Sequence, residues 1–248
     1  MRIRATDRPR KDETLDAFYR GRIHILQKKK GYRFSVDAPL LADFIRARTG
    51  EEGLELGAGN GVISLLLSLK PFRRLTALEV QAGLARLAAR NVRLNGLENR
   101  VRVVRGDLRR FRLRRRFDVV FSNPPYIKRG LGFPSPVAEK NIAKHEIKCD
   151  ILDVMNAAAR SLKRKGRAYF VYPVSRREDF LAALGKNGLT VRRMRYVRSR
   201  RGAPPGLFLA ECGFGPSRRR VEAALVLFGA GGVSTVEAER IFSGRRHA

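Results

Sequence analysis

The chain has 248 residues, 44% of them hydrophobic, and a formal net charge of +30 from 53 lysines and arginines against 23 acidic residues. This content excludes a disordered chain, while the lack of a secretory signal or an apolar run of about 18 residues argues against an exported or membrane protein. Two distant cysteines, Cys149 and Cys212, argue against a disulfide framework or a metal site. We expect a cytoplasmic protein, and a monomer. Its positive charge favours binding to nucleic acid over binding to an acidic membrane or a merely solvated surface.

The first 50 residues predict a small extension packed on a larger domain. Residues 1–16 are charged and irregular, and they suggest a loose arm. Polar and apolar residues alternate over 22–27, which predicts a half-buried strand, and residues 32–34 would form the returning strand after a lysine-rich turn. Asp37 is expected to cap a helix that extends over 37–48.

From residue 51 to residue 215, predicted strands and helices alternate. Strands are expected at 53–56, 75–80, 101–104, 116–122 and 167–172, and helices at 62–69, 82–94, 151–162 and 178–184. Two further strands, 191–197 and 207–212, have no helix between them and predict an antiparallel hairpin. The pattern indicates an α/β, Rossmann-like fold with a mostly parallel seven-stranded sheet. Residues 216–248 are expected to form an appendage, for which the sequence predicts no role. Within it, residues 221–228 are apolar enough to form either a strand or a helix.

A glycine-rich turn follows the first strand of this core. Gly57, Gly59 and Gly61 allow the backbone to approach a ligand at the start of a helix. Val62 stands where the dinucleotide-binding fingerprint requires glycine, so that pattern is not met. With Glu55 two residues upstream, the turn resembles the signature of class I methyltransferases. The resemblance implies that these four residues bind S-adenosylmethionine.

Two further acidic residues follow strands of the same sheet. Glu79 ends the second strand, where a carboxylate can accept hydrogen bonds from both ribose hydroxyls of a nucleoside. Asp107 follows the third strand, where the methyltransferase family places a carboxylate against the adenine amino group. The carboxyl ends of parallel strands share one edge of a sheet, so these acids are predicted to lie beside the glycine turn.

The fourth strand ends in Asn123, Pro124, Pro125 and Tyr126. Two prolines must stop the strand, because they lack backbone donors. Within a class I methyltransferase, this sequence resembles the motif of enzymes that methylate planar amines: adenine N6, cytosine N4 or a glutamine amide. The Asn123 side chain and the Pro124 carbonyl are expected to accept the amine hydrogens, and Asn123 is also expected to lie beside the cofactor. Tyr126 is expected to stack on the target base.

The N-terminal segment carries a narrower resemblance. Residues 27–38 and 40–42 resemble the corresponding part of bacterial tRNA (adenine-N6)-methyltransferases that modify an adenine beside the anticodon of a valine tRNA, and the similarity covers roughly residues 12–215. It implies that Tyr32, Arg33, Phe34 and Asp37 lie near the cofactor. Alternatively, Tyr32 and Phe34 only pack the hairpin.

The basic residues favour RNA as the substrate. Lys128, Arg129 and Lys144 follow Tyr126 and are expected, with Pro125, to contact substrate, while arginine clusters at 105–116 and 192–201 are candidate phosphate contacts. The leading hypothesis is adenine-N6 methylation of RNA, most readily tRNA. The alternatives are a protein (glutamine-N5) methyltransferase for release factors, which usually carries an N-terminal helical domain, and a non-catalytic RNA-binding module.

Overall fold

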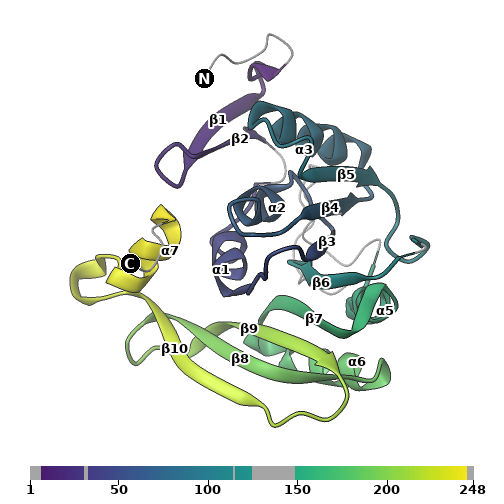
Figure 1. Ribbon diagram of the computed structural model, residues 1–248. Coiled ribbons are helices and arrows are strands. Elements are labelled where there is room, and N and C mark those ends of the chain that lie inside the picture. Colours follow the sequence, from purple (N-terminus) through teal and green to yellow (C-terminus); the bar gives the residue numbers. More distant parts are fainter. Residues whose placement is uncertain (1–6, 31–32, 114, 125–148, 245–248) are drawn as a thin grey trace.

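An eight-stranded sheet forms the centre of the computed structural model, which describes residues 7–30, 33–113, 115–124 and 149–244 (Figure 1). The strand order is β10-β8-β9-β7-β6-β3-β4-β5. Strand β9 is antiparallel to β7 and to β8, and all other neighbours in this sheet are parallel. The predicted Rossmann-like fold and the antiparallel hairpin are therefore confirmed. The sheet has one strand more than the seven predicted, because the C-terminal appendage supplies β10.

The elements follow the predicted alternation closely within the core. The strands of the sheet are β3 (Glu52–Leu56), β4 (Arg74–Glu79), β5 (Val101–Arg105), β6 (Phe117–Ser122), β7 (Leu162–Pro173), β8 (Leu189–Arg200), β9 (Pro205–Phe214) and β10 (Arg220–Phe228). The helices are α1 (Asp37–Phe44), α2 (Val62–Leu67), α3 (Ala82–Leu94), α5 (Ile151–Ser161), α6 (Arg177–Lys186) and α7 (Val236–Ser243), with short 3₁₀ turns η2 (Val174–Arg176) and η3 (Ala230–Gly232).

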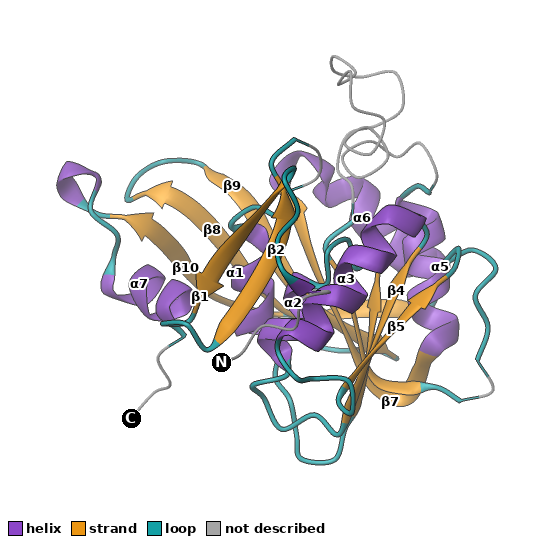
Figure 2. Ribbon diagram, turned by 90° about the horizontal axis from the view of Figure 1, so that it is seen from above, coloured by secondary structure: helices purple, strands orange, loops and turns teal. Residues whose placement is uncertain are grey.

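Helices cover both faces of the sheet (Figure 2). Strand β6 shows why its apolar run predicts a buried strand: Val119 and Phe121 join the cluster under α1, α2 and α7, whereas Phe117 and Val120 join the cluster under α5 and α6. Successive side chains of a strand point to opposite faces, so a strand covered on both sides must be apolar throughout. The core therefore fixes β6 and the loop that follows it.

Residues 13–28 form a separate hairpin, so the loose arm predicted for residues 1–16 is wrong from residue 13 onward. Strand β1 (Glu13–Phe18) pairs with β2 (Ile23–Lys28), so the prediction that residues 32–34 provide the partner of β2 was wrong. The charged sequence of β1 does not look like a strand, because the residue that neutralises its buried charge lies far away in the chain. The buried Glu13 carboxylate accepts two hydrogen bonds from Arg90 Nη1, at 2.7 and 2.9 Å.

Two asparagines, Asn91 in α3 and Asn95 at its C-cap, bind the free edge of β2 in place of a neighbouring strand. Asn91 Oδ1 accepts from the Leu26 amide at 2.7 Å, and its Nδ2 donates to the Leu26 carbonyl at 3.1 Å. Asn95 does the same with the amide and carbonyl of His24, at 2.8 and 2.7 Å. The spacing of four residues puts both amides on one side of the helix, so the hairpin is held against α3.

Helix α1 is shorter than predicted and begins differently. Val36 is the N-cap, without a side-chain capping bond, and Asp37 is the first helical residue, so its predicted capping role was wrong. The helix ends at Phe44 instead of reaching residue 48. Lys70 Nζ donates to the carbonyls of Ala42, Asp43 and Ile45, which replaces the hydrogen bonds that a further turn would make.

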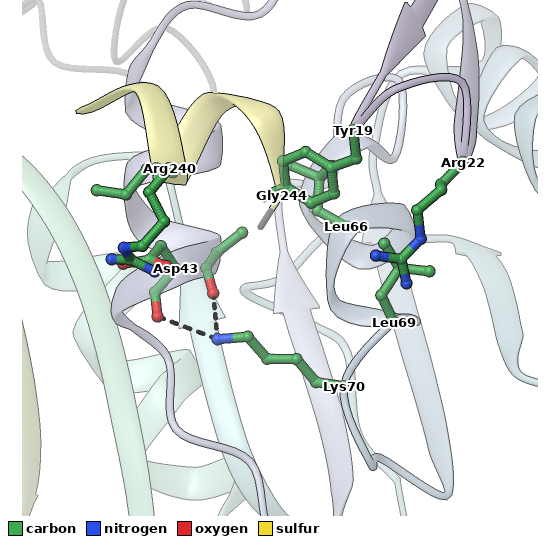
Figure 3. A pocket seen from close by; sticks show the side chains of 10 residues that line it. Tyr19, Arg22, Asp43, Leu66, Leu69, Lys70, Arg240 and Gly244 are labelled. Carbon is green, nitrogen blue, oxygen red and sulfur yellow. Dashed lines mark hydrogen bonds and ion pairs between the residues drawn. The ribbon is translucent and has the colours of Figure 1, made fainter. Parts of the chain in front are cut away.

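The C-terminal helix α7 packs against α1, and the residue after it packs against the turn between β1 and β2. Arg240 forms a two-pronged ion pair with Asp43, at 3.1 and 3.2 Å. Gly244 lies against the ring of Tyr19, with a backbone φ of +66°. A pocket of about 320 Å³ remains between these elements, and Lys70 borders it (Figure 3). The appendage is thus an integrated part of the fold.

The described residues include neither a helix able to cross a membrane nor a metal-binding cluster. No described helix is long and apolar enough to span a bilayer, and no group of three His, Cys, Asp or Glu side chains among these residues is placed to hold a metal ion. Cys149 and Cys212 are free thiols. Complete burial raises the pKa of the Cys212 thiol, which therefore stays protonated.

Candidate functional site

The strand order brings the predicted site loops together at one edge of the sheet. Strands β6, β3, β4 and β5 are consecutive neighbours and all parallel, so their carboxyl ends lie side by side. The Ser122 hydroxyl at the end of β6 donates to the Leu56 carbonyl at the end of β3, at 2.7 Å. Asn123 and Gly57 each follow one of these two residues. The planar-amine motif and the glycine turn therefore begin next to each other.

Hydrogen bonds also tie the glycine turn to β4 and β4 to the next loop. The amides of Gly57 and Ala58 both donate to the Leu78 carbonyl at 2.9 Å, and the Gly106 amide donates to the Glu79 carbonyl at 3.0 Å. Asp107 therefore begins its loop beside the end of β4. The structure brings Asn123, Gly57, Glu79 and Asp107 to the same edge, as the sequence predicted.

The turn requires glycine for its backbone conformation. Gly57, Gly59 and Gly61 have φ values of +73°, +58° and +84°, which residues with a side chain rarely adopt. A Cβ on Gly61 would also approach the Cβ of Ala88 to 3.2 Å. The glycines let the chain reverse between β3 and α2 while α3 packs closely behind.

Glu55 holds the start of α2. Its buried carboxylate accepts from the Ser64 amide at 3.1 Å and from the Ser64 hydroxyl at 2.5 Å. The N-cap of α2 is Gly61, which has no side chain, so Glu55 supplies the missing capping group from the preceding strand. Burial, with the nearby charge of Glu79, raises the pKa of Glu55 to about 8, so the protonated carboxyl is favoured at neutral pH.

Backbone amides of the glycine turn and of the residues after β4 orient the Glu79 carboxylate. The Gly59 amide donates to Oε2 and the Gln81 amide to Oε1, each at 2.8 Å. Two backbone donors on different oxygens fix the orientation of this carboxylate at the end of β4. A carboxylate held at this place can serve as the acceptor for the two ribose hydroxyls of a nucleoside.

Asp107 is paired with an arginine that the sequence reasoning did not single out as its partner. Arg109 Nε lies 3.0 Å from both carboxylate oxygens, and its Nη2 lies 2.5 Å from Oδ2. This hydrogen-bonded pair lowers the pKa of Asp107, and the carboxylate stays ionised at neutral pH. An ionised carboxylate can still accept a hydrogen bond from an exocyclic amine, so the pairing is compatible with an adenine at this position.

Asn60 is a candidate site residue that the sequence reasoning missed. It lies inside the glycine turn and is fully buried, and neither its Oδ1 nor its Nδ2 has a hydrogen-bond partner among the described residues. Buried polar groups are nearly always satisfied, so an orphaned amide at this turn is a feature that a polar ligand group would resolve. Its place between Gly59 and Gly61 was the available signal.

The remaining predicted site residues divide into those that the structure describes and those outside it. Asn123 is partly exposed and Pro124 is buried at the end of β6. Phe34 is partly buried, and its ring lies 5.0 Å from the ring of Phe18. Arg33 forms an ion pair with Asp16 at 3.0 Å. Outside the described residues lie Tyr32, Pro125, Tyr126, Lys128, Arg129 and Lys144.

Several arginines of the predicted phosphate-binding clusters have internal partners. Arg193 is buried, with its guanidinium 3.7 Å from the centre of the Phe44 ring and ion pairs to Glu211 and Glu222 at 2.9 and 3.3 Å. Arg195 pairs with Glu237 at 2.8 Å. The prediction that Arg193 contacts phosphate was therefore wrong, because tertiary packing places it in the interior. Part of the positive charge thus serves to join strands and helices.

Comparison with known proteins agrees with this geometry. The model of the "Methyltransferase small domain" family matches residues 33–179. A tRNA1(Val) (adenine(37)-N6)-methyltransferase of Tolumonas auensis is 28% identical over 75% of this chain and 78% of its own. The enzyme of the same name from Phocaeicola vulgatus is 28% identical over 70% of this chain and 73% of its own.

Solved structures show the same fold. A predicted O-methyltransferase from Agrobacterium tumefaciens superposes with a TM-score of 0.66 over 85% of this chain and 97% of its own, at 20% identity. A tRNA m1G37 methyltransferase from M. jannaschii gives a TM-score of 0.57 over 82% of this chain and 55% of its own, at 14% identity.

The family match and the residues at the sheet edge agree on the cofactor. The carboxylates of Glu79 and Asp107 and the glycine turn fit the nucleoside of S-adenosylmethionine, and this molecule is the cofactor. The match covers more than half of the chain and includes β3 to β7, which carry the site. The chain belongs to the methyltransferase small domain family and is an S-adenosylmethionine-dependent methyltransferase.

Proposed function

We infer that the chain transfers a methyl group to the exocyclic N6 of an adenine in tRNA, acting as a cytoplasmic monomer. The observation that carries the proposal is the position of Asn123 beside the glycine turn, fixed by the 2.7 Å hydrogen bond between Ser122 and Leu56. The names of the relatives, which align over most of this chain, support adenine N6 of tRNA as the acceptor. The net charge of +30 supports a polyanionic substrate.

The cofactor-binding half of the site comes from β3, β4 and β5. Glu79 would accept the ribose hydroxyls, Asp107 the adenine amino group, and the turn of Gly57, Gly59 and Gly61 would lie against the nucleoside. Glu55 would act through α2 as a positioning residue, and Tyr32 and Phe34 would cover the cofactor. When bound, S-adenosylmethionine supplies an electrophilic methyl group.

The acceptor half of the site comes from the loop after β6. An exocyclic adenine amine is a poor nucleophile, because its lone pair is delocalised into the ring. The side-chain oxygen of Asn123 and the carbonyl of Pro124 would each accept one amine hydrogen, orient the lone pair and stabilise the positive charge that develops on nitrogen. Tyr126 would stack on the base, and Pro125, Lys128, Arg129 and Lys144 would contact the substrate around it.

The proposal is tested by offering the protein labelled S-adenosylmethionine with separate pools of tRNA, rRNA and release factor. We expect label only in tRNA, recovered as N6-methyladenine by mass spectrometry of the nucleosides. Label in release factor would replace the proposal with glutamine methylation, and cofactor binding without label in any pool would indicate a non-catalytic module.

A variant pair tests the role of Asn123. We expect Asn123→Ala to abolish transfer while S-adenosylmethionine binding, measured by calorimetry, stays near the wild-type value. Asn156→Ala removes an exposed amide from α5 and is the matched control, with transfer unchanged. Equal loss of cofactor binding and transfer in Asn123→Ala would contradict the assigned role.

A further inference from the structure

The ends of β8 and β10 enclose a groove that neither the fold nor the proposed chemistry requires. Its volume is about 590 Å³, and it is lined by the ends of β8 and β10 and the segments that follow each of them: Arg200, Arg201, Val226, Phe228, Gly229, Ala230 and Thr235. Strands β8 and β10 end side by side (Figure 2). Phe228 is paired in register with Arg200. The groove therefore lies between the end of β8 and the C-terminal appendage, the part of the chain without a predicted role.

The segment after β10 folds back in a way that leaves the Phe228 ring accessible. The Gly229 amide donates to the Val233 carbonyl at 2.8 Å, and the Thr235 hydroxyl donates to the Val226 carbonyl at 2.7 Å. These bonds fix the wall of the groove, while Phe228 remains 39% exposed. A large aromatic ring held open on a rigid strand end is a surface on which a base can stack.

The two arginines of the groove differ from the rest of their cluster. Arg193 and Arg195 have acidic partners, Arg192 donates to the Phe214 carbonyl and Arg198 to the Ala203 carbonyl. Arg200 and Arg201 are exposed, and among the described residues their guanidinium groups have no acidic or hydrogen-bonding partner. Two uncompensated guanidiniums beside an exposed ring form a surface complementary to phosphate and base together.

The strand directions place this groove on the same edge of the sheet as the methyltransferase site. Strands β6, β7, β8 and β10 all point the same way. The register pairs Ser122 with Phe170, Pro173 with Leu207, Leu207 with Val197, and Arg200 with Phe228. Following it, Arg200 lies six residues beyond Ser122 along the strands and three strands to the side, or roughly 25 Å away.

We propose that this groove is a second RNA-docking site, which binds the sugar-phosphate backbone and an accessible base of the substrate RNA away from the methylated adenine. The inference rests on the proposed function, because it takes the RNA held at Asn123 as the occupant. A separation of roughly 25 Å is too large for the target nucleotide and suits another part of a folded RNA. Arg200 and Arg201 bind phosphates, and Phe228 stacks on a base.

Direct RNA binding tests the groove independently of methyl transfer. End-labelled tRNA is titrated with protein at several salt concentrations, and the dissociation constant and its salt dependence are measured by fluorescence anisotropy. We expect Arg200→Gln/Arg201→Gln to raise the dissociation constant about 10-fold and to reduce the slope of log affinity against log salt by about 1.5. Phe228→Ala should weaken binding about 10-fold without changing the slope, because stacking releases no counterions.

The matched control removes the same charge near the opposite end of the neighbouring strand. Arg218→Gln/Arg219→Gln changes two exposed arginines just before the opposite end of β10, and we expect it to leave affinity and slope near wild type. Equal effects of the two double variants would show that RNA responds only to the overall positive charge and not to this groove. Wild-type binding by the groove variants would contradict the docking site. Concentration-dependent dimerisation of the protein, abolished by Phe228→Ala, would assign the groove to a second copy.

The outcomes also separate this inference from the proposed function. If tRNA binds with the expected differences but no N6-methyladenine forms, the proposed function fails and the docking site stands. If N6-methyladenine forms and the groove variants bind tRNA like the wild type, the docking site fails and the proposed function stands.

Discussion

Replacing Glu55 with glutamine is expected to change how folding stability depends on pH. The wild-type carboxyl is buried, and its pKa is raised to about 8 from an ordinary value of 4.5. The folded protein therefore binds this proton more tightly than the unfolded chain does, and the stability gained from it is fully present below pH 4.5. The gain is lost as the pH rises through 8. Glutamine keeps an acceptor for Ser64 and does not titrate.

The size of the effect follows from the pKa shift. Each unit of pKa difference corresponds to about 1.4 kcal/mol, so the wild type should lose roughly 3 kcal/mol relative to Glu55→Gln between pH 5 and pH 8. The variant thus becomes the relatively more stable protein towards high pH. Groups that do not interact with Glu55 titrate equally in both proteins, so the difference between the two reports the contribution of Glu55 together with its coupling to Glu79.

Urea denaturation at pH 5, 6, 7 and 8 measures this difference. Glu98→Gln, a change of an exposed glutamate after α3, is the control and should follow the wild type at every pH. Parallel stability curves for the wild type and Glu55→Gln would refute the reasoning, because they would mean that Glu55 has the same pKa in the folded and unfolded protein. A difference of opposite sign would show that the buried carboxylate is stabilised in its ionised form.

Three further substitutions test how the site is supported. Gly61→Ala should destabilise the protein by about 1–2 kcal/mol in urea denaturation, because it puts a Cβ at φ +84° and against α3, whereas the control Gly185→Ala inside α6 should be neutral or stabilising by about 0.5 kcal/mol. Lys70→Met should cost about 2–3 kcal/mol by the same measurement, because it leaves the last carbonyls of α1 unsatisfied, and a stability equal to the wild type would contradict its capping role. Asn91→Ala should speed hydrogen exchange at the Leu26 amide while exchange in β6 stays slow, and equal protection in both proteins would show that the hairpin does not depend on this side chain.

The sequence predicted the core of the fold because its signals there are local and physically unambiguous. The apolar run of 117–122 must be buried on both faces, and two prolines must end it. Three glycines spaced two apart require a turn that other residues cannot make. Because the carboxyl ends of parallel strands share one edge, this order of elements was sufficient to predict that Asn123, Gly57, Glu79 and Asp107 lie together.

The edges of the fold could not be predicted in the same way, since their signals depend on partners far away in the chain. Strand β1 reads as a charged arm in the sequence because the partner of Glu13, Arg90, lies far away in the chain. Residues 221–228 fit a strand or a helix, and pairing with the edge of β8 makes them a strand. The sequence alone counts Arg193 and Arg200 as equivalent positive charges. Arg193 is buried and forms ion pairs with acidic residues of β9 and β10, whereas Arg200 lies at the end of β8 and is exposed.

The sequence by itself therefore determined the class of chemistry, methyl transfer, and predicted its parts from short local patterns: a glycine turn, the acidic residues beside it and a motif for a planar amine. Only the tertiary structure decided which side chains support that chemistry. Glu55 caps a helix, Asp107 is held by Arg109, and the C-terminal appendage extends the sheet. The reason is physical, because burial and charge pairing are set by neighbours that the chain meets only when it folds.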